Sequence, residues 1–189
     1  PRMSASKPEL KVALVGYAFM GRAHSNAFQQ VERYFDCPYR LKRSVLVGRN
    51  QEACRQVADT WGWQHTAASL DEVLRQHDID LVDIATPNDV HHTQALAALK
   101  AGKHVLCEKP LALTVAQAKA MAAAAAKAKV RTLIWHNYRR CPAASTAASL
   151  IRDGKLGEIR QVRAVYLQDW LHDDACPWLW RMDSKVCGS

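Results

Sequence analysis

The sequence has no long hydrophobic run. Across its 189 residues, no window approaches the roughly 18 consecutive apolar residues that a membrane-spanning helix requires. The opening stretch, PRMSASKPEL, is polar and does not contain the apolar segment of a secretory signal. We therefore expect a soluble protein with a flexible arm over residues 1–10 and no membrane partner.

Clustered cysteines and clustered positive charge are also missing. The six cysteines are scattered, form no Cys-x-x-Cys pair and have no histidine beside them at a spacing that suits zinc. The sequence therefore predicts reduced thiols, no metal site and a cytoplasmic protein. The 26 Lys and Arg residues give a net charge of +8 but are dispersed, without the basic runs of nucleic-acid-binding modules. Because the charge is dispersed, we expect no nucleic-acid partner. An anionic small molecule needs only a local basic cluster.

Apolar runs typical of strands alternate with segments typical of helices. Strands are predicted at residues 11–16, 44–48, 80–85, 104–109 and 131–136. Helices are predicted to follow them at residues 20–32, 51–61, 90–101, 114–128 and on to about 153. Between the second and third of these helices, Ser69 is expected to cap a short helix that follows a short strand, with Glu72 in the capping-box position. The alternation predicts an α/β protein with a Rossmann-type, doubly wound parallel sheet.

The pattern changes at Gly157. The stretch GEIRQVRAVYLQDW, residues 157–170, predicts a strand that no helix follows, and it opens a new unit. The residues from 157 to 189 are too few to enclose a domain, so we expect the chain to be cut short.

The first predicted strand leads into a glycine loop, VGYAFMG, with Gly16, Ala18 and Gly21 in place of a Gly-x-Gly-x-x-Gly pattern. In a dinucleotide-binding loop the glycines make a tight turn, admit the pyrophosphate and let the helix pack on the strand. Ala18 places a methyl group where the second glycine admits the phosphates. An imperfect glycine pattern is also typical of an ordinary turn, but its position between the first strand and a helix favours the binding interpretation.

The end of the second predicted strand bears on the choice of cofactor. An acid at this point accepts a hydrogen bond from the adenosine 2′-hydroxyl of NAD and repels the 2′-phosphate of NADP. The sequence has Gly48-Arg49-Asn50 instead, and Arg49 could pair with a phosphate through two hydrogen bonds. NADP is therefore slightly preferred over NAD, with a solvated turn arginine as the alternative.

Two further clusters follow strand ends. Thr86-Pro87-Asn88 and then His91 follow the strand at 80–85, where isolated residues of these types would simply cap a helix. Glu108-Lys109 ends the strand at 104–109 and could be a surface ion pair of little energetic weight. A partly desolvated lysine at this sheet edge could instead exchange a proton with a bound substrate.

Taken together, VALVGYAFMGRAHSNA, ATPNDVHHTQALAALKAGKHVLCEKPLALT, HNYRR and WLWR resemble the glucose-fructose oxidoreductase and inositol dehydrogenase family, Gfo/Idh/MocA, over residues 10–189. The resemblance implies a dinucleotide-binding domain over residues 11–136. It also implies that residues 137–189 begin an α/β domain with a large open sheet, which holds a sugar or polyol and mediates homo-oligomers. The implied reaction is hydride transfer between a substrate carbon and NAD(P).

The same resemblance assigns roles to individual residues. It assigns the loop of Gly16, Ala18, Phe19, Met20 and Gly21 to the pyrophosphate and Arg49 to the adenosine ribose. Glu108 and Lys109 would meet the nicotinamide ribose and the substrate, and Lys109 would be the catalytic residue that polarises or deprotonates the reacting hydroxyl. The remaining residues expected near the cofactor are Thr86, Pro87, Asn88, His91, Asn137, Trp180 and Arg181.

Members of this family complete their proton-transfer group with an aspartate and a histidine beyond the Trp-Arg segment. The present sequence stops at VCGS, so we expect the chain alone to be inactive and the full-length protein to be a dehydrogenase or reductase. The alternative is a non-catalytic, dinucleotide-binding regulatory protein or a cofactor-binding fragment. The downstream aspartate and histidine discriminate between these functions.

Overall fold

A single parallel sheet forms the centre of the protein, as the sequence predicts. The computed structural model describes residues 7–169, 173 and 175–188. The strands are β1 Glu9–Val15, β2 Arg40–Val47, β3 His65–Ala67, β4 Leu81–Ile84, β5 His104–Cys107 and β6 Thr132–Ile134. Their order is β3-β2-β1-β4-β5-β6 and every neighbouring pair is parallel. This is the doubly wound Rossmann arrangement, so the predicted fold class is confirmed.

Helices connect the strands close to the predicted positions. They are α1 Phe19–Tyr34, α2 Gln51–Trp61, α3 Leu70–Gln76, α4 His91–Lys100, α5 Val115–Ala128, α6 Pro142–Arg152 and α7 Ser184–Cys187. Short 3-10 helices occur at η1 Asn88–Val90, η2 Asn137–Arg140 and η3 Trp180–Met182. Within this described part of the chain, no helix is both long enough and apolar enough to cross a membrane.

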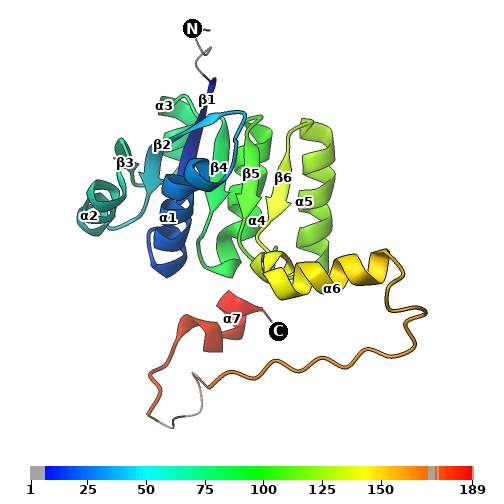
Figure 1. Cartoon of the computed structure of the whole chain (residues 1–189). Coiled ribbons are helices and arrows are strands. Elements are labelled where there is room, and N and C mark those ends of the chain that lie inside the picture. The colour runs from blue at the N-terminus through cyan, green and yellow to red at the C-terminus, as the bar shows by residue number, and fades with distance from the viewer. Residues whose placement is uncertain (1–6, 170–172, 174, 189) are drawn as a thin grey trace, which may run out of the picture.

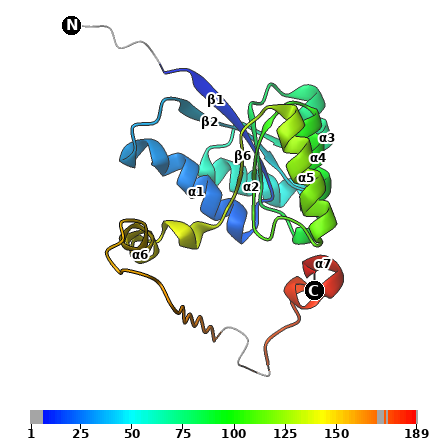
Figure 2. The ribbon, with the colours of Figure 1, turned by 90° about the vertical axis from the view of Figure 1, so that its right-hand side faces the viewer.

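The helices form a layer on each face of the sheet. Along β1, Val12 and Leu14 belong to the same buried cluster as Phe28 of α1, whereas Ala13 and Val15 belong to the cluster that contains Met121 of α5. Figure 2 shows the two layers, with α3, α4 and α5 on one face and α1 and α2 on the other. Because both faces of the central strands are covered, residues 12–15 of β1 and residues 45–47 of β2 form continuous apolar runs rather than an alternating pattern.

Capping residues set several helix starts. Ser69 Oγ accepts a hydrogen bond from the Glu72 backbone N–H at 3.2 Å, which confirms the predicted cap of α3. The Glu72 carboxylate reaches back to the Ala68 N–H at 2.9 Å, one residue before the position that a capping box uses. Thr114 caps α5 in the same way as Ser69 caps α3, by accepting from the Gln117 N–H.

The chain reverses its winding direction between β1 and β4, the two central strands. To one side of this point the order runs β1-β2-β3, and to the other it runs β4-β5-β6. The loops that follow β1 and β4 therefore diverge at the carboxyl edge of the sheet, which is where ligands bind in open α/β folds.

The ends of the described chain differ from the predictions. Glu9 and Leu10, which we expected in the flexible arm, begin β1 and pair with Arg40 and Leu41 of β2; residues 1–6 lie outside the described residues. The strand predicted over residues 157–170 is wrong, because the structure assigns no strand to residues 157–169, and residue 170 lies outside the described part.

The reason for that error is physical. Residues 159–167 run as an extended, exposed stretch beyond α6, with Val162 and Leu167 81% and 87% exposed (Figure 1). An alternating apolar pattern indicates which side chains a sheet would bury, but a strand also needs a neighbouring strand that supplies its hydrogen bonds.

Candidate functional site

The turn between β1 and α1 can accept only glycine at two positions. Gly16 has φ +106°, and a Cβ atom there would lie 2.4 Å from the Ala85 carbonyl oxygen at the end of β4. A Cβ atom on Gly21 would lie 2.1 Å from the Gly16 carbonyl oxygen. The two glycines thus allow the turn to pass close over β4 and allow α1 to pack against the turn.

The start of α1 is suited to an anion. Ala18 is the N-cap residue, and no described side chain caps this helix start. The first helical hydrogen bond runs from the Arg22 N–H to the Ala18 carbonyl, so the N–H groups of Phe19, Met20 and Gly21 precede the helical ladder. Such N–H groups, together with the helix dipole, attract phosphate.

Ala18 itself fits the turn without strain, since its φ of −70° lies in a region open to any residue. The position therefore tolerates alanine, and only the space that its methyl group occupies distinguishes it from glycine.

The tip of β2 has no acid, and its polar residues are used unequally. Asn50 caps α2, with its Oδ1 accepting from the Ala53 N–H at 3.1 Å. A Cβ atom on Gly48 would lie 2.2 Å from the Tyr17 ring, so the absence of a side chain at Gly48 makes room for that ring. Arg49 is exposed and forms no ion pair within the described part of the chain.

The tip of β5 is occupied by a buried cluster of charged side chains. Asp83 lies in the middle of β4 and is fully buried, and His24 of α1 and Glu108 are also buried. His24 Nδ1 lies 2.8 Å from Asp83 Oδ2, and His24 Nε2 lies 3.1 Å from Glu108 Oε1. Trp135, which follows β6, donates from Nε1 to Asp83 Oδ1 at 2.9 Å. Four elements of the fold therefore meet in one hydrogen-bonded group.

His24 must be a cation in this arrangement. Each of its ring nitrogens faces a carboxylate oxygen, and ionised carboxylates only accept hydrogen bonds, so both nitrogens carry a proton. Burial alone would lower the pKa of His24, but the hydrogen bonds and charges of Asp83 and Glu108 outweigh it and raise that pKa to about 9.

The cluster also shifts the pKa values of Glu108 and of the neighbouring Cys107 thiol. Burial acts to raise the pKa of Glu108, yet the hydrogen bonds from His24 and from the Lys109 N–H bring it below its usual value. Burial, with the nearby charges of Asp83 and Glu108, raises the pKa of the Cys107 thiol to about 12. Cys107 is therefore a neutral core residue and not a nucleophile.

Glu108 and Lys109 point to different environments. Glu108 Oε2 accepts from the Lys109 backbone N–H at 3.1 Å, while the Lys109 side chain is exposed. The surface ion pair considered from the sequence is therefore wrong, because Glu108 is buried with His24. The Lys109 side chain is exposed in this structure, and its partial desolvation beside a bound cofactor and substrate stays a prediction.

The residues after β4 tie the site together. His91 is fully buried, and its ring nitrogens lie 2.8 Å from the Pro110 carbonyl oxygen and 2.9 Å from the Thr86 carbonyl oxygen. It thereby joins the turn after β4 to the turn after β5. Thr86 donates to Gln94 Oε1 at 2.8 Å, and Pro87, between Thr86 and η1, is exposed.

The C-terminal segment lies over the same edge. Asn88, in η1, does not cap a helix; its Nδ2 donates to the Cys187 carbonyl of α7 at 3.1 Å. Figure 1 shows α7 below the carboxyl edge of the sheet. Trp180 and Arg181 lie in η3 next to α7, with the Arg181 guanidinium carbon 4.6 Å from the Trp180 ring centroid.

The structure brings together some of the predicted residues but not all. Contacts at the carboxyl edge connect Gly16, Thr86, Asn88, His91 and Glu108. Arg49 and Asn137 are exposed at other strand ends of this edge, after β2 and after β6.

The sequence analysis missed His24, Asp83 and Trp135. One signal was present, because Asp83 interrupts the otherwise apolar run of a central strand. A buried acid in that position requires a partner, but the sequence does not show that the partner is on α1.

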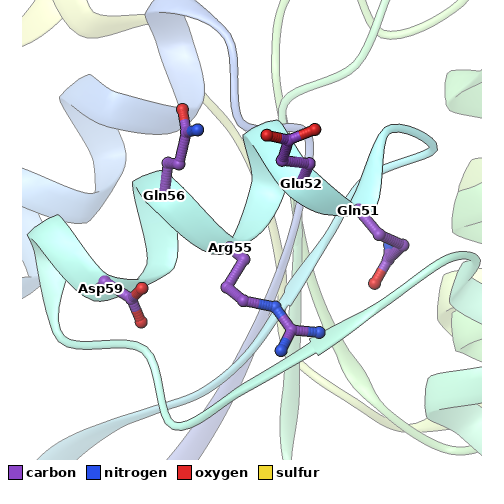
Figure 3. A pocket seen from close by; sticks show the side chains of 5 residues that line it. All are labelled: Gln51, Glu52, Arg55, Gln56 and Asp59. Carbon is purple, nitrogen blue, oxygen red and sulfur yellow. The ribbon is translucent and has the colours of Figure 1, made fainter.

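Two shallow pockets lie elsewhere. One lies along α2, lined by Gln51, Glu52, Arg55, Gln56 and Asp59, and Figure 3 shows these polar side chains projecting from a single helix. The other lies between α1 and α2 and is lined by Tyr17, Arg22, Ala53, Gln56, Val57, Thr60 and Trp61. Neither contains a residue of the cluster around His24.

Comparisons with known proteins agree with this geometry. The model of the GFO_IDH_MocA oxidoreductase family, NAD-binding Rossmann fold, matches residues 10–136. Levoglucosan dehydrogenase of Pseudarthrobacter phenanthrenivorans is 39% identical over 181 residues, which are 95% of this chain and 46% of that protein. The 1,5-anhydro-D-fructose reductase of Ensifer adhaerens is 36% identical over 126 residues, 65% of this chain and 36% of that protein.

Solved structures show the same similarity. An oxidoreductase domain protein from Kribbella flavida superimposes with a TM-score of 0.93 at 50% identity, over 96% of this chain and 49% of that chain. A levoglucosan dehydrogenase in complex with NADH superimposes with a TM-score of 0.92 at 38% identity, over 96% and 49% of the two chains.

The chain therefore belongs to the GFO_IDH_MocA oxidoreductase family, and residues 10–136 form the family's NAD-binding Rossmann fold. The chain spans about half the length of the relatives that match nearly all of it.

Proposed function

We propose that the full-length protein is an NAD(P)-dependent dehydrogenase or reductase that transfers a hydride between nicotinamide and a carbon of a sugar, inositol or related polyol. The observation that carries the proposal is the carboxyl edge of the sheet, where the uncapped start of α1 and the exposed Lys109 side chain both lie. Relatives named as a levoglucosan dehydrogenase and a 1,5-anhydro-D-fructose reductase support the substrate class.

The dinucleotide fits the residues that are present. Gly16 and Gly21 place no side chain at the two closest approaches of the turn, and the N–H groups of Phe19, Met20 and Gly21 at the start of α1 can bind the pyrophosphate. Arg49 binds the adenosine ribose and, in NADP(H), its 2′-phosphate. The residues along the path to the nicotinamide are Thr86, Pro87, Asn88, His91 and Asn137, with Trp180 and Arg181 reaching from the C-terminal segment.

Lys109 acts on the substrate in this proposal. The bound cofactor supplies the hydride acceptor or donor. The Lys109 side chain forms a hydrogen bond with the reacting oxygen. As a neutral amine it accepts the hydroxyl proton during oxidation, and as an ammonium group it returns a proton during reduction. Substrate and cofactor cover this side chain when they bind, which strengthens its electrostatic interaction with the oxygen.

The domain organisation follows from the same proposal. Residues 11–136 bind the dinucleotide, and residues 137–189 begin a second domain whose open sheet binds the substrate and forms homo-oligomers. The 189-residue chain alone binds cofactor without turnover, because the resemblance assigns the remaining proton-transfer residues to a downstream segment.

The test is Lys109→Met in the full-length protein. Turnover with a sugar or inositol substrate should fall by roughly 10²- to 10⁴-fold, the usual contribution of a proton-transfer group, while the Kd for NAD(P)(H) changes little. Lys127→Met is the matched control, since Lys127 is exposed at the far end of α5. Wild-type turnover in Lys109→Met would overturn the catalytic role. Cofactor binding by the unmodified full-length protein, without turnover of any polyol or sugar, would favour the non-catalytic regulatory alternative.

A further inference from the structure

Two members of the buried cluster, His24 and Asp83, have no part in the function proposed above. The cluster places one positive side chain, His24, inside the protein within hydrogen-bonding distance of two negative ones, Asp83 and Glu108. Burying charges in this way is costly unless each is paired, and a core can be packed with apolar residues at less cost. The cluster therefore calls for a functional explanation.

The hydrogen bonds of the cluster form a continuous chain from the centre of the sheet to the site. Asp83 is held in β4 and accepts from Trp135, and its other oxygen accepts from His24. His24 donates in turn to Glu108, whose second oxygen accepts from the Lys109 backbone N–H. Each link fixes the orientation of the next, and the last link is the main chain of Lys109.

We propose that His24 is a positioning residue, which holds the Glu108 carboxylate and, through it, the backbone of Lys109 at the carboxyl edge of the sheet. The proposal rests on the proposed function of Lys109. Glu108 then has a structural task in addition to any contact with the nicotinamide ribose, because each of its oxygens already accepts a bond within the protein.

An imidazolium satisfies this geometry when both carboxylates are ionised. It donates in two opposite directions, and the two acceptors are carboxylates on different strands. A glutamine at position 24 could donate to one carboxylate but would turn its own carbonyl oxygen towards the other. Removal of the positive charge also leaves Asp83 and Glu108 as two buried anions, and the second anion would turn away or take up a proton.

Among the residues that the structure describes, His24 forms ion pairs with Asp83 and Glu108 alone. From its own helix, Ser25 donates to the Gly21 carbonyl and accepts from Trp63 Nε1. From β5, Cys107 is a neutral thiol, and from beyond β6 the Trp135 ring lies 5.0 Å from the His24 ring. The Lys109 ammonium group is exposed. Asp83 and Glu108 thus determine the charge of His24, and His24 determines the position of Glu108.

The experiment compares His24→Gln, Lys109→Met and the double variant in the full-length protein. His24→Gln should lower kcat by about 10- to 100-fold, because a small displacement of a catalytic group has effects of this size. The Kd for NAD(P)(H) should stay nearly unchanged. In the Lys109→Met background the same substitution should have no further effect on kcat, since there is no lysine left to position. His65→Gln, at an exposed histidine, is the matched control.

A spectroscopic measurement tests the chain of bonds without activity. The ring protons of His24, followed by NMR over pH 5–10, should titrate near pH 9 in the wild-type protein and at lower pH in Glu108→Gln. Glu108→Gln also replaces the acceptor for the Lys109 N–H with an amide, and it serves as the second kinetic variant if His24→Gln does not fold. It should lower kcat, by less than Lys109→Met does.

The outcomes separate the two proposals. Wild-type turnover in Lys109→Met would refute the proposed function. A large effect of Lys109→Met, combined with wild-type kcat in folded His24→Gln or Glu108→Gln, would refute the positioning role alone. A loss of kcat in His24→Gln that is equally large in the Lys109→Met background would also overturn it, because such a loss does not pass through Lys109.

Discussion

The tips of β2 and β5 lie on the same edge of one sheet, but they present their charged residues in opposite ways. At the β2 tip, Arg49 is exposed and forms no ion pair within the described residues, and the neighbouring Asn50 only caps α2. At the β5 tip, Glu108 is buried and bound to His24 and to the Lys109 main chain. Arg49 can therefore be replaced without disturbing the core, whereas Glu108 is part of the core.

The two strand ends therefore suit different functions, one the selection of the cofactor and the other the chemical step. A residue that selects between two cofactors needs contact with the ligand and little else, so an exposed arginine on a rigid turn suffices. A group that acts on the reacting atoms must be held in a fixed place, which favours a buried anchor behind it. The predictions below test whether the two tips differ in this way.

The largest expected effect is on folding. Asp83→Ala removes the buried acceptor of both His24 and Trp135, and breaking one partner of a buried charge pair costs about 3–5 kcal/mol. We expect the free energy of unfolding in denaturant to fall by this amount. Arg49→Ala, the control at the other tip, should change it by no more than about 0.5 kcal/mol. Equal effects of the two substitutions would remove the distinction between the tips.

The second prediction concerns pH. Because the folded pKa of His24 is raised from 6.5 to about 9, its stabilising contribution is complete below about pH 6.5 and is lost as pH rises through about 9. This difference in pKa corresponds to about 3 kcal/mol. Glu108, whose pKa is lowered, contributes in the opposite sense, with stability lost as pH falls through the acidic range below about 4.5.

The midpoint of thermal unfolding should therefore decrease between pH 7 and pH 10 in the wild-type protein and in Arg49→Ala. His24→Gln should lack most of this alkaline decrease. An identical pH profile in His24→Gln and the wild-type protein would show that His24 is not the titrating group.

The fold was largely predictable from the sequence, because it depends on signals that are local in the chain. The apolar runs of β1 and β4 identified these segments as strands, and Ser69 marked the start of α3 correctly. The predicted strand at 157–170 failed for the opposite reason. Its side-chain pattern is local, but strand formation depends on a neighbouring strand that local sequence does not specify.

The candidate site was predictable only in part. Gly16 and Gly21 could be identified because a tight turn imposes a residue type. The cluster of His24, Asp83 and Trp135 depends on side chains from α1, β4 and the end of β6, which the fold brings together across more than fifty positions of sequence. A buried aspartate in an apolar strand indicates that a partner exists, but not where it lies.

The third prediction concerns the exposed tip. Arg49→Ala should weaken NADP(H) binding by about 1–3 kcal/mol, the range for a charge-assisted hydrogen bond, and should weaken NAD(H) binding less. Fluorescence titration of both cofactors measures the difference, with Arg55→Ala as the control on the outer side of α2 (Figure 3). A strong preference for NAD(H) that Arg49→Ala does not alter would mean that Arg49 is only a solvated turn residue.

The smallest expected effect is at Ala18, which lies at neither strand tip. Alanine and glycine at this position differ only by one methyl group. Ala18 has an ordinary φ of −70°, so replacing it with glycine relieves no strain and gains only space above the uncapped N–H groups of α1. Ala18→Gly should tighten NAD(H) and NADP(H) equally, by less than about 1 kcal/mol, whereas a change at Arg49 separates the two cofactors. Isothermal titration with each cofactor gives both Kd values. An unchanged Kd for both cofactors would show that the methyl group already lies clear of the pyrophosphate. A change in the Kd of only one cofactor would indicate that the adenosine ribose lies nearer to α1 than its proposed contact with Arg49 requires.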